Sequence, residues 1–278
     1  LCTRPLRDAL PIWRAAEKIT YGRLHERVGR LANALTHLGV EKGQRVAICL
    51  PMVSEAVVAM LACARIGAVH VVLFGGFSAE GIAERLVDSG TVAVITANVA
   101  RRGAKLVPFK ETIDEALHKA GSASSVHSVL VVSTSDDPVL MLPGRDYNYH
   151  DFVDEFEADF VPVLMNAEDP LFLLYTSGST GKPKAIVHAC GGYIVWAAYT
   201  MGMVSTHQPG DVLWCTAAVA WITGPTSVVY GPPANGGPTL ISDSLPNHPY
   251  PGPWWDRWDQ SKVTMLFTAP TAVRTLMA

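Results

Sequence analysis

The sequence predicts an α/β protein in which helices cover both faces of largely parallel sheets. Two observations support this prediction. Short runs of branched apolar residues alternate along the chain with segments of helical periodicity. The apolar runs are also continuous, rather than apolar at every second position. Continuous apolar strands are typical of sheets buried on both faces, as in α/β architectures.

Eight segments have strand-like sequence, rich in Val, Ile, Leu and Phe. They cover residues 45–50, 68–74, 92–97, 128–133, 171–175, 212–216, 238–242 and 263–267. Five further segments have helical spacing, and they cover residues 21–38, 53–66, 79–88, 111–119 and 189–203. In the first of these, apolar residues recur from Leu24 to Leu35 at intervals of three and four, and Gly39 follows where a glycine cap ends a helix.

Two less regular segments bear on the domain organisation. Residues 134–170 are more acidic than their neighbours, and we interpret them as a connection between two subdomains, 1–150 and 151–278. Residues 243–255 contain four prolines, which predicts a long loop or a cluster of turns.

Composition excludes several classes of partner. The 278 residues are 49% hydrophobic and 17% charged, with a formal net charge of −3, which gives no electrostatic reason to expect binding to nucleic acid or to an acidic membrane. No apolar run is long enough to cross a bilayer. The 5 cysteines are dispersed and show neither disulfide nor zinc spacing, which indicates free thiols in a reducing, cytoplasmic compartment. The chain begins with leucine, so we expect it to be part of a longer protein.

A glycine- and hydroxyl-rich turn follows the strand-like run 171–175. It comprises Thr176, Ser177, Gly178, Ser179, Thr180, Gly181 and Lys182, with Lys184 two residues further on. Glycines let successive backbone N–H groups converge on an anion, and lysine adds positive charge, so the turn predicts a phosphate site. Because a helical pattern resumes near residues 188–191, we also expect a helix N-terminus close to this turn.

Two other phosphate or nucleophile motifs do not fit this turn. A Walker A loop needs four residues between its glycines and Ser or Thr after the lysine, whereas here two residues separate Gly178 from Gly181 and Pro183 follows Lys182. A serine-hydrolase elbow fails because neither serine has glycine two residues away on both sides. A polar surface loop without a ligand is the remaining alternative.

The stretch "YTSGSTGKPKAIVH" resembles the phosphate-loop signature of adenylate-forming enzymes. Further blocks resemble, within that family, the AMP-forming acetyl-CoA synthetases. They are "MLACARIGAVHVVLFGGFSAE", "RRGAK", "WCTAAVAWITGPTSVVYGP", "LPNHP" and "TAPTAVRTLMA". The resemblance implies a layered αβαβα N-terminal domain that is truncated here, with the small C-terminal domain absent.

The resemblance implies that the protein takes part in the reaction of this family. Acetate and ATP, accompanied by Mg²⁺, would give acetyl-adenylate and pyrophosphate, and CoA would then form the thioester and release AMP. The lysine that promotes adenylation would lie beyond Ala278, so we expect the chain alone to be inactive and assign it no catalytic residue. Two alternatives stay open: part of a propionyl-CoA synthetase, or a non-catalytic protein that binds a nucleotide or CoA. No resident metal and no particular oligomeric state is indicated.

The resemblance also implies three sets of contacts. Residues 176–182 would grip the phosphates of ATP, with Lys184 as a weaker candidate. The CoA contacts would be Gly76, Arg102, Gly103, Ala104, Lys105, Thr223, Asn247 and Ala269. The acyl pocket would be formed by Trp221, Ile222 and Thr223.

Four positions depart from the pattern of acetyl-CoA synthetases. Ala185 and Ala220 stand where glycine is expected, Ala218 replaces an aspartate, and Pro225 replaces a histidine. Each alanine that replaces glycine is tolerable only where φ is negative. His70 and His188 lie in apolar runs without a carboxylate at catalytic spacing, so we interpret them as structural residues.

Overall fold

The computed structural model describes residues 17–103, 105–176, 183–208, 210–248 and 252–277. Within them, seven strands form one sheet in the order β7-β6-β3-β1-β2-β8-β9. All neighbouring strands in this sheet are parallel except β8 and β9. The strands are β1 (Arg45–Cys49), β2 (Val69–Val72), β3 (Thr91–Ala97), β6 (Ser128–Val132), β7 (Asp146–Asn148), β8 (Pro170–Thr176) and β9 (Lys184–Ala189).

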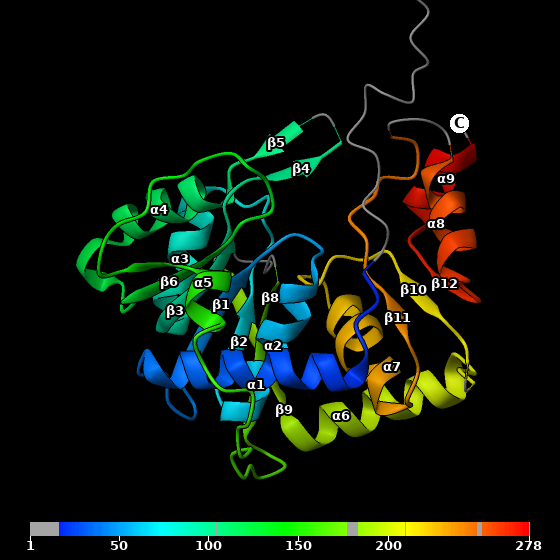
Figure 1. The fold of residues 1–278 in the computed structure, drawn as a ribbon, viewed down its shortest axis with the longest axis horizontal. Coiled ribbons are helices and arrows are strands. Elements are labelled where there is room, and N and C mark those ends of the chain that lie inside the picture. The colour runs from blue at the N-terminus through cyan, green and yellow to red at the C-terminus, as the bar shows by residue number, and fades with distance from the viewer. Residues whose placement is uncertain (1–16, 104, 177–182, 209, 249–251, 278) are drawn as a thin grey trace, which may run out of the picture.

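Helices cover both faces of this sheet, as the continuous apolar strands predict (Figure 1). The chain crosses from β1 to β2 in one direction along the sheet, and from β2 to β3 in the other, so right-handed connections place α2 and α3 on opposite faces. Helix α1 packs on α2, and α3 packs on α4. These helices are α1 (Tyr21–His37), α2 (Ser54–Ile66), α3 (Ala79–Ser89) and α4 (Phe109–Ala120).

A second, three-stranded sheet lies beside the first and has the order β11-β10-β12, with both pairs parallel. Its strands are β10 (Leu213–Cys215), β11 (Thr239–Leu240) and β12 (Met265–Phe267). The associated helices are α6 (Cys190–Tyr199), α7 (Gly231–Ala234), α8 (Pro253–Ser261) and α9 (Pro270–Met277), with π-helical segments at Thr200–Val204 and Pro225–Tyr230. The remaining elements are the hairpin β4 (Ala100–Arg102) and β5 (Lys105–Val107), the short helix α5 (Tyr149–Val153) and a 3₁₀ turn (Gly121–Ala123).

All eight predicted strands and all five predicted helices are confirmed, and so is the α/β class. The predicted cap at Gly39 is also confirmed, because Gly39 has φ of +82° directly after the C-cap residue Leu38. Residues 243–248 form a loop, as the prolines predict, but α8 already begins at Pro253. The division into subdomains 1–150 and 151–278 stays a prediction, and β8 and β9 complete the sheet that β1 begins.

The expectation of a helix N-terminus next to the glycine-rich turn is wrong. The turn lies between two antiparallel strands, and Thr176 at the end of β8 pairs with Lys184 at the start of β9. Helix α6 begins only at the far end of β9, roughly 20 Å away for a strand of this length. The first N–H groups of α6 are already used, because Cys190 N donates to Asp169 O at 2.9 Å and Gly191 N donates to Ala167 O at 2.9 Å.

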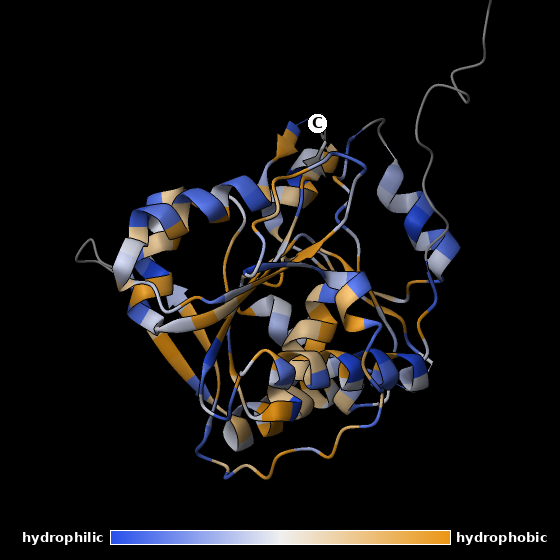
Figure 2. Ribbon diagram, turned by 60° about the vertical axis from the view of Figure 1, so that its left-hand side comes forward, coloured by the Kyte–Doolittle hydropathy of each residue, from blue (hydrophilic) through white to orange (hydrophobic). Residues whose placement is uncertain are grey.

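The core is apolar and centred on the seven-stranded sheet (Figure 2). His70 is fully buried within it, and its ring stacks on Phe172 with centroids 5.1 Å apart. Phe172 in turn stacks on His188 at 4.2 Å. Burial, together with the charge that His188 would carry, lowers the pKa of His70 to about 3, so His70 is neutral. These contacts are those of a structural residue.

An extended strap, residues 155–168, runs across α1 and α2 without helix or strand structure. Side chains of those helices and of the loop after α1 hold its backbone. Asn33 Nδ2 donates to the carbonyls of Glu157 and Asp159 at 2.8 and 2.9 Å. Arg30, Arg65 and Lys42 donate to the carbonyls of Phe156, Phe160 and Leu164. Hydrogen bonds from side chains therefore replace a strand ladder here.

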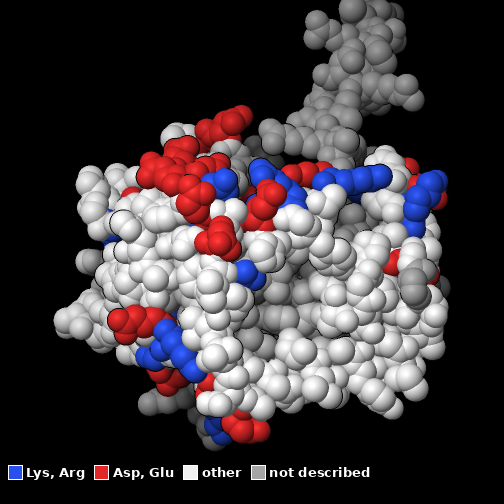
Figure 3. All heavy atoms as spheres, turned by 60° about the horizontal axis from the view of Figure 1, so that its bottom comes forward, with Lys and Arg blue, Asp and Glu red and all other residues white. Residues whose placement is uncertain are grey.

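One surface of the molecule is apolar and uncharged. Neither α6 nor the π-helical segment after it contains a charged residue, and the face in Figure 3 shows a wide area free of Lys, Arg, Asp and Glu. The exposed apolar side chains on these segments and on β9 are Ile186, Val187, Ile194, Val195, Trp196, Tyr199, Met203 and Val204.

Candidate functional site

A cavity of about 920 Å³ lies where the carboxyl ends of strands from both sheets meet. On the side of the seven-stranded sheet, its walls are the residues that follow β1 and β2, namely 50–52 and 73–77. On the other side, they are the residues that end or follow β10, β11 and β12, from the ranges 215–223, 242–246 and 267–272. Ligands of open α/β sheets bind outside the carboxyl ends of the strands, and here two such edges enclose one space.

The hairpin β4–β5 and the start of α4 close a third side of the cavity. Lys105, Leu106 and Val107 of β5 line it, followed by Pro108, Phe109 and Thr112. The hairpin turns at Gly103, where φ is +64°, a backbone conformation that glycine adopts without strain. A Cβ added at Gly103 would lie 3.0 Å from Leu245, so the hairpin tip also packs against the loop that follows β11.

The cavity is mostly apolar, with few charged groups in its wall. Lys105 and Asp243 carry the only charged side chains among the lining residues described. Burial raises the pKa of Asp243, and the positive charge of Arg257 counteracts this in part. A site of this kind suits a long, partly apolar ligand whose few polar groups are held at defined points.

Six of the predicted CoA and acyl residues line this one cavity although they are spread along the chain. They are Gly76, Lys105, Trp221, Ile222, Thr223 and Ala269. Trp221 keeps 62% of its surface exposed, and its ring lies 6.4 Å from that of Phe74 on the opposite wall. Asn247 does not line the cavity, but the residue directly before it, Pro246, does. Arg102 ends β4 at the hairpin tip, and Ala104 lies outside the described residues.

The predicted phosphate turn is only bordered by described residues. Residues 177–182 lie outside them, whereas Thr176 and Lys184 form the paired ends of β8 and β9. Tyr175 Oη donates to Asp88 Oδ2 at 2.6 Å, which fixes the end of β8 against α3. The Arg85 guanidinium lies 4.1 Å from the Phe77 ring centroid and 5.5 Å from that of Tyr175. Arg85 thus bridges the cavity wall at Phe77 and the strand that leads into the turn.

The four departures from the family pattern fit the backbone. Ala185 pairs with Tyr175 inside β9, and neither Ala185 nor Ala220 has positive φ, so alanine is compatible with both positions. Pro225 is the first residue of the π-helical segment, where a missing N–H costs nothing. Ala218 and Ala220 line the cavity, so these two substitutions change its surface directly.

Sequence reasoning missed several wall residues, among them Phe109, Thr112 and Asp243. Phe109 faces Gly75 so closely that a Cβ on Gly75 would lie 2.3 Å from its ring. In the sequence, only the two adjacent glycines 75 and 76 indicate that a side chain packs directly on the backbone in this part of the cavity wall.

Among the described residues, no three His, Cys, Asp or Glu side chains are grouped as a metal site requires. No helix in the described part of the chain is both long and apolar enough to span a membrane.

The comparisons with known proteins identify the family of the chain. A family model described as "AMP-binding enzyme" matches residues 3–278, and the chain belongs to this family. The chain is a homologue of acetyl-coenzyme A synthetases: it is 53% identical over 259 residues to that of Caulobacter vibrioides, covering 93% of this chain and 40% of the relative. It is also 49% identical over 263 residues to that of Nostoc linckia, covering 95% of this chain and 77% of the relative.

A solved structure shares the fold. Acetoacetyl-CoA synthetase from Streptomyces lividans superposes with a TM-score of 0.83 at 26% identity, covering 94% of this chain and 39% of that one. The chain therefore spans about 40% of the length of the Caulobacter relative and of this solved structure.

Proposed function

We propose that the chain supplies the CoA-binding and phosphate-binding part of an AMP-forming acetate–CoA ligase. The observation that carries the proposal is the convergence on one cavity of Gly76, Lys105, the segment 221–223 and Ala269. The family resemblance assigns these residues to CoA and to the acyl group, and they are separated by up to two thirds of the chain. Their convergence is what a shared CoA and acyl site requires.

The two steps of the reaction would use two parts of the chain: the glycine-rich turn, residues 176–182, for adenylation, and the cavity for thioester formation. An acetate oxygen attacks the α-phosphorus of ATP, pyrophosphate leaves, and the acetyl-adenylate forms. Backbone N–H groups of residues 176–182 and the Lys182 ammonium would stabilise the charge on the leaving pyrophosphate, and Mg²⁺ would arrive with ATP as part of that substrate. The CoA sulfur then attacks the acetyl carbonyl carbon, and AMP leaves.

The cavity would hold CoA so that its thiol end approaches the acyl group. Arg102 and Lys105 at the hairpin are cations suited to the phosphates at the adenosine end. The apolar wall suits the pantetheine arm, and Trp221, Ile222 and Thr223 would limit the size of the acyl group. One methylene more in such a pocket changes binding by about 1–3 kcal/mol, so we expect acetate to be preferred over propionate by a modest factor.

Free thiols support a reducing, cytoplasmic location for this activity. The described cysteines Cys49, Cys63, Cys190 and Cys215 form no disulfide with one another. Burial raises the pKa of Cys49 and of Cys63 to about 12, which makes both thiols unreactive.

Calorimetric titration of the purified chain with CoA tests the proposal. We expect saturable binding of CoA, and loss of affinity when Lys105 is replaced by Ala. Because the chain alone is expected to be inactive, acetate-dependent exchange of pyrophosphate into ATP is measured on the longer protein that the chain is expected to belong to, and it separates a ligase from a protein that only binds CoA or nucleotide. Absence of CoA binding would exclude the proposed function, and CoA binding without exchange by that longer protein would favour the non-catalytic alternative.

A further inference from the structure

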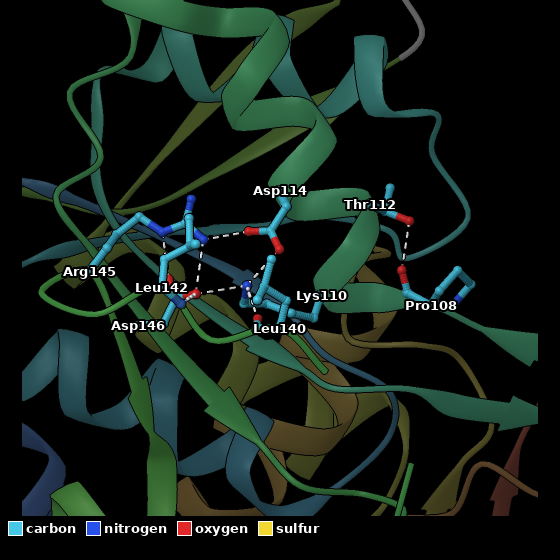
Figure 4. A network of polar contacts seen from close by, with 8 residues as sticks. All are labelled: Pro108, Lys110, Thr112, Asp114, Leu140, Leu142, Arg145 and Asp146. Atoms are coloured by element: carbon cyan, nitrogen blue, oxygen red, sulfur yellow. Dashed lines mark hydrogen bonds and ion pairs between the residues drawn. The ribbon is translucent and has the colours of Figure 1, made fainter. Parts of the chain in front are cut away.

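A buried group of charged residues lies behind the cavity wall, at the start of α4. The Lys110 side chain has no exposed surface, and its Nζ lies 2.7 Å from Asp114 Oδ2, 2.8 Å from Asp146 Oδ2 and 3.0 Å from the carbonyl oxygen of Leu140. Arg145 contacts the carboxylates of both Asp114 and Asp146 (Figure 4). All three hydrogens of the Lys110 ammonium therefore have an acceptor.

The two carboxylates in this group come from different elements. Asp114 lies one turn after Lys110 on α4, whereas Asp146 begins β7, the edge strand paired with β6. Burial alone would raise the pKa of Asp146, but hydrogen bonds from Arg145, from the backbone of Leu142 and from Lys110 lower it overall, so this carboxylate is charged. Lys110 thereby ties the start of α4 to the edge of the main sheet.

The position of Lys110 is unfavourable for a cation. It is the second residue of α4, close to the positive end of the helix dipole, and the N-cap residue Pro108 supplies no side-chain hydrogen bond. A buried lysine there is compatible with folding only because two carboxylates and a carbonyl surround it. A leucine or methionine here would avoid burying a cation, but it would leave the buried carboxylate of Asp146 with Arg145 as its only cationic partner among the described residues.

The same helical turn forms part of the cavity wall. Phe109 and Thr112 flank Lys110 and line the cavity, and Thr112 Oγ1 donates to the carbonyl of Pro108 at 2.7 Å. Pro108 directly follows β5, which carries Lys105. Whatever fixes this turn also fixes the base of the hairpin β4–β5.

From these contacts we infer that Lys110 is a positioning residue: its buried ion pairs hold the first turn of α4, and through it the hairpin β4–β5, in the place where the hairpin meets a ligand of the cavity. The inference rests on the proposed function in naming CoA as that ligand. Lys110 itself touches no ligand. It acts on the end of CoA that the hairpin would contact, the phosphorylated adenosine.

Replacing Lys110 by Met tests this, because Met keeps the length of the side chain and removes the charge. Hydrogen–deuterium exchange should rise in peptides covering β4 and β5, and the dissociation constant for CoA should rise about tenfold. Binding of pantetheine, which lacks the adenosine end, should stay unchanged. A lysine with only a general structural role would weaken both ligands equally or neither.

Lys119 on the same helix is the matched control, since it also lies near two carboxylates, Glu80 and Glu115, but on the exposed surface away from the cavity. Lys119→Met should leave hairpin exchange and CoA binding unchanged. If Lys110→Met does not fold, Asp114→Asn removes one of the two ion pairs and should give a smaller change of the same kind.

The possible outcomes distinguish the positioning role of Lys110 from the proposed binding of CoA. Unchanged hairpin exchange in folded Lys110→Met or Asp114→Asn would overturn the positioning role, and so would an equal effect of Lys119→Met. If the unmodified chain fails to bind CoA, the proposed function is wrong, and hairpin exchange still decides whether Lys110 holds the hairpin.

Discussion

Tyr230 Oη lies 2.7 Å from His70 Nε2, a contact between residues 160 positions apart in the chain. Both side chains are buried, and His70 Nδ1 has no hydrogen-bond partner among the described residues. The contact joins β2 of the main sheet to the π-helical segment Pro225–Tyr230, which follows β10 in the chain.

The stability of the protein is expected to fall as the pH drops below about 6.5. The folded state holds the pKa of His70 at about 3, so between these two values the unfolded chain binds a proton that the folded chain does not. The free energy of unfolding then decreases by up to about 1.4 kcal/mol per pH unit. Urea unfolding at several pH values measures this slope. His70→Phe should flatten it, whereas replacing the exposed His118 by Gln should not; an equal slope in all three proteins would contradict the assignment.

Tyr230→Phe should lower the free energy of unfolding by about 1–3 kcal/mol, because His70 Nε2 would lose its hydrogen-bond partner in a buried site. Tyr199→Phe is the control, since Tyr199 is 63% exposed and its change should stay within about 0.5 kcal/mol. Denaturant unfolding at neutral pH compares the two variants. Similar stability of both would show that the buried contact contributes nothing.

Trp221 should report ligand binding by its fluorescence, because it is 62% exposed and lines the cavity. CoA is expected to change the emission of the unmodified protein, and Trp221→Phe should remove most of that change. Trp255 is also exposed but is not a lining residue, so Trp255→Phe should keep it. A response that survives both in Trp221→Phe and in Trp254→Phe, the other tryptophan of the cavity wall, would place the ligand elsewhere.

Lys182→Ala should weaken binding of ATP with Mg²⁺ about tenfold or more, because a charged hydrogen bond to phosphate would be lost. Lys184→Ala should have a smaller effect, and Lys18→Ala, at an exposed position before α1, none. Calorimetry measures all three. Unchanged affinity in Lys182→Ala would remove Lys182 from the phosphate site, while unfolding data should show the fold intact.

The regular elements were predictable because their signals are local. Continuous apolar runs and three-to-four spacing identified every strand and helix with a strong pattern. Strand β9 was missed because it is half-exposed and its apolar residues merge with those of α6. The mistaken expectation of a helix N-terminus at the glycine-rich turn followed from this omission.

The site was predictable only in part. The family blocks predicted Gly76, Lys105 and the segment 221–223 as site residues, and these line one cavity, but the meeting of two carboxyl edges is a matter of tertiary structure. Lys110 and Asp114 have the spacing of an ordinary surface ion pair. Their burial depends on Asp146, more than thirty residues away, so no local pattern predicts it.

The strap of residues 155–168 has a consequence for how freely its sequence can change. The donors from Arg30, Asn33, Lys42 and Arg65 all reach main-chain carbonyls, which every residue type possesses. Phe156 and Phe160 pack against the core, whereas other side chains of the strap point to solvent, and Leu164 keeps 91% of its surface exposed. Substitutions or labels can therefore be placed at exposed strap positions such as Leu164 while the four donor side chains persist, which makes them suitable sites to attach a probe without disturbing the cavity.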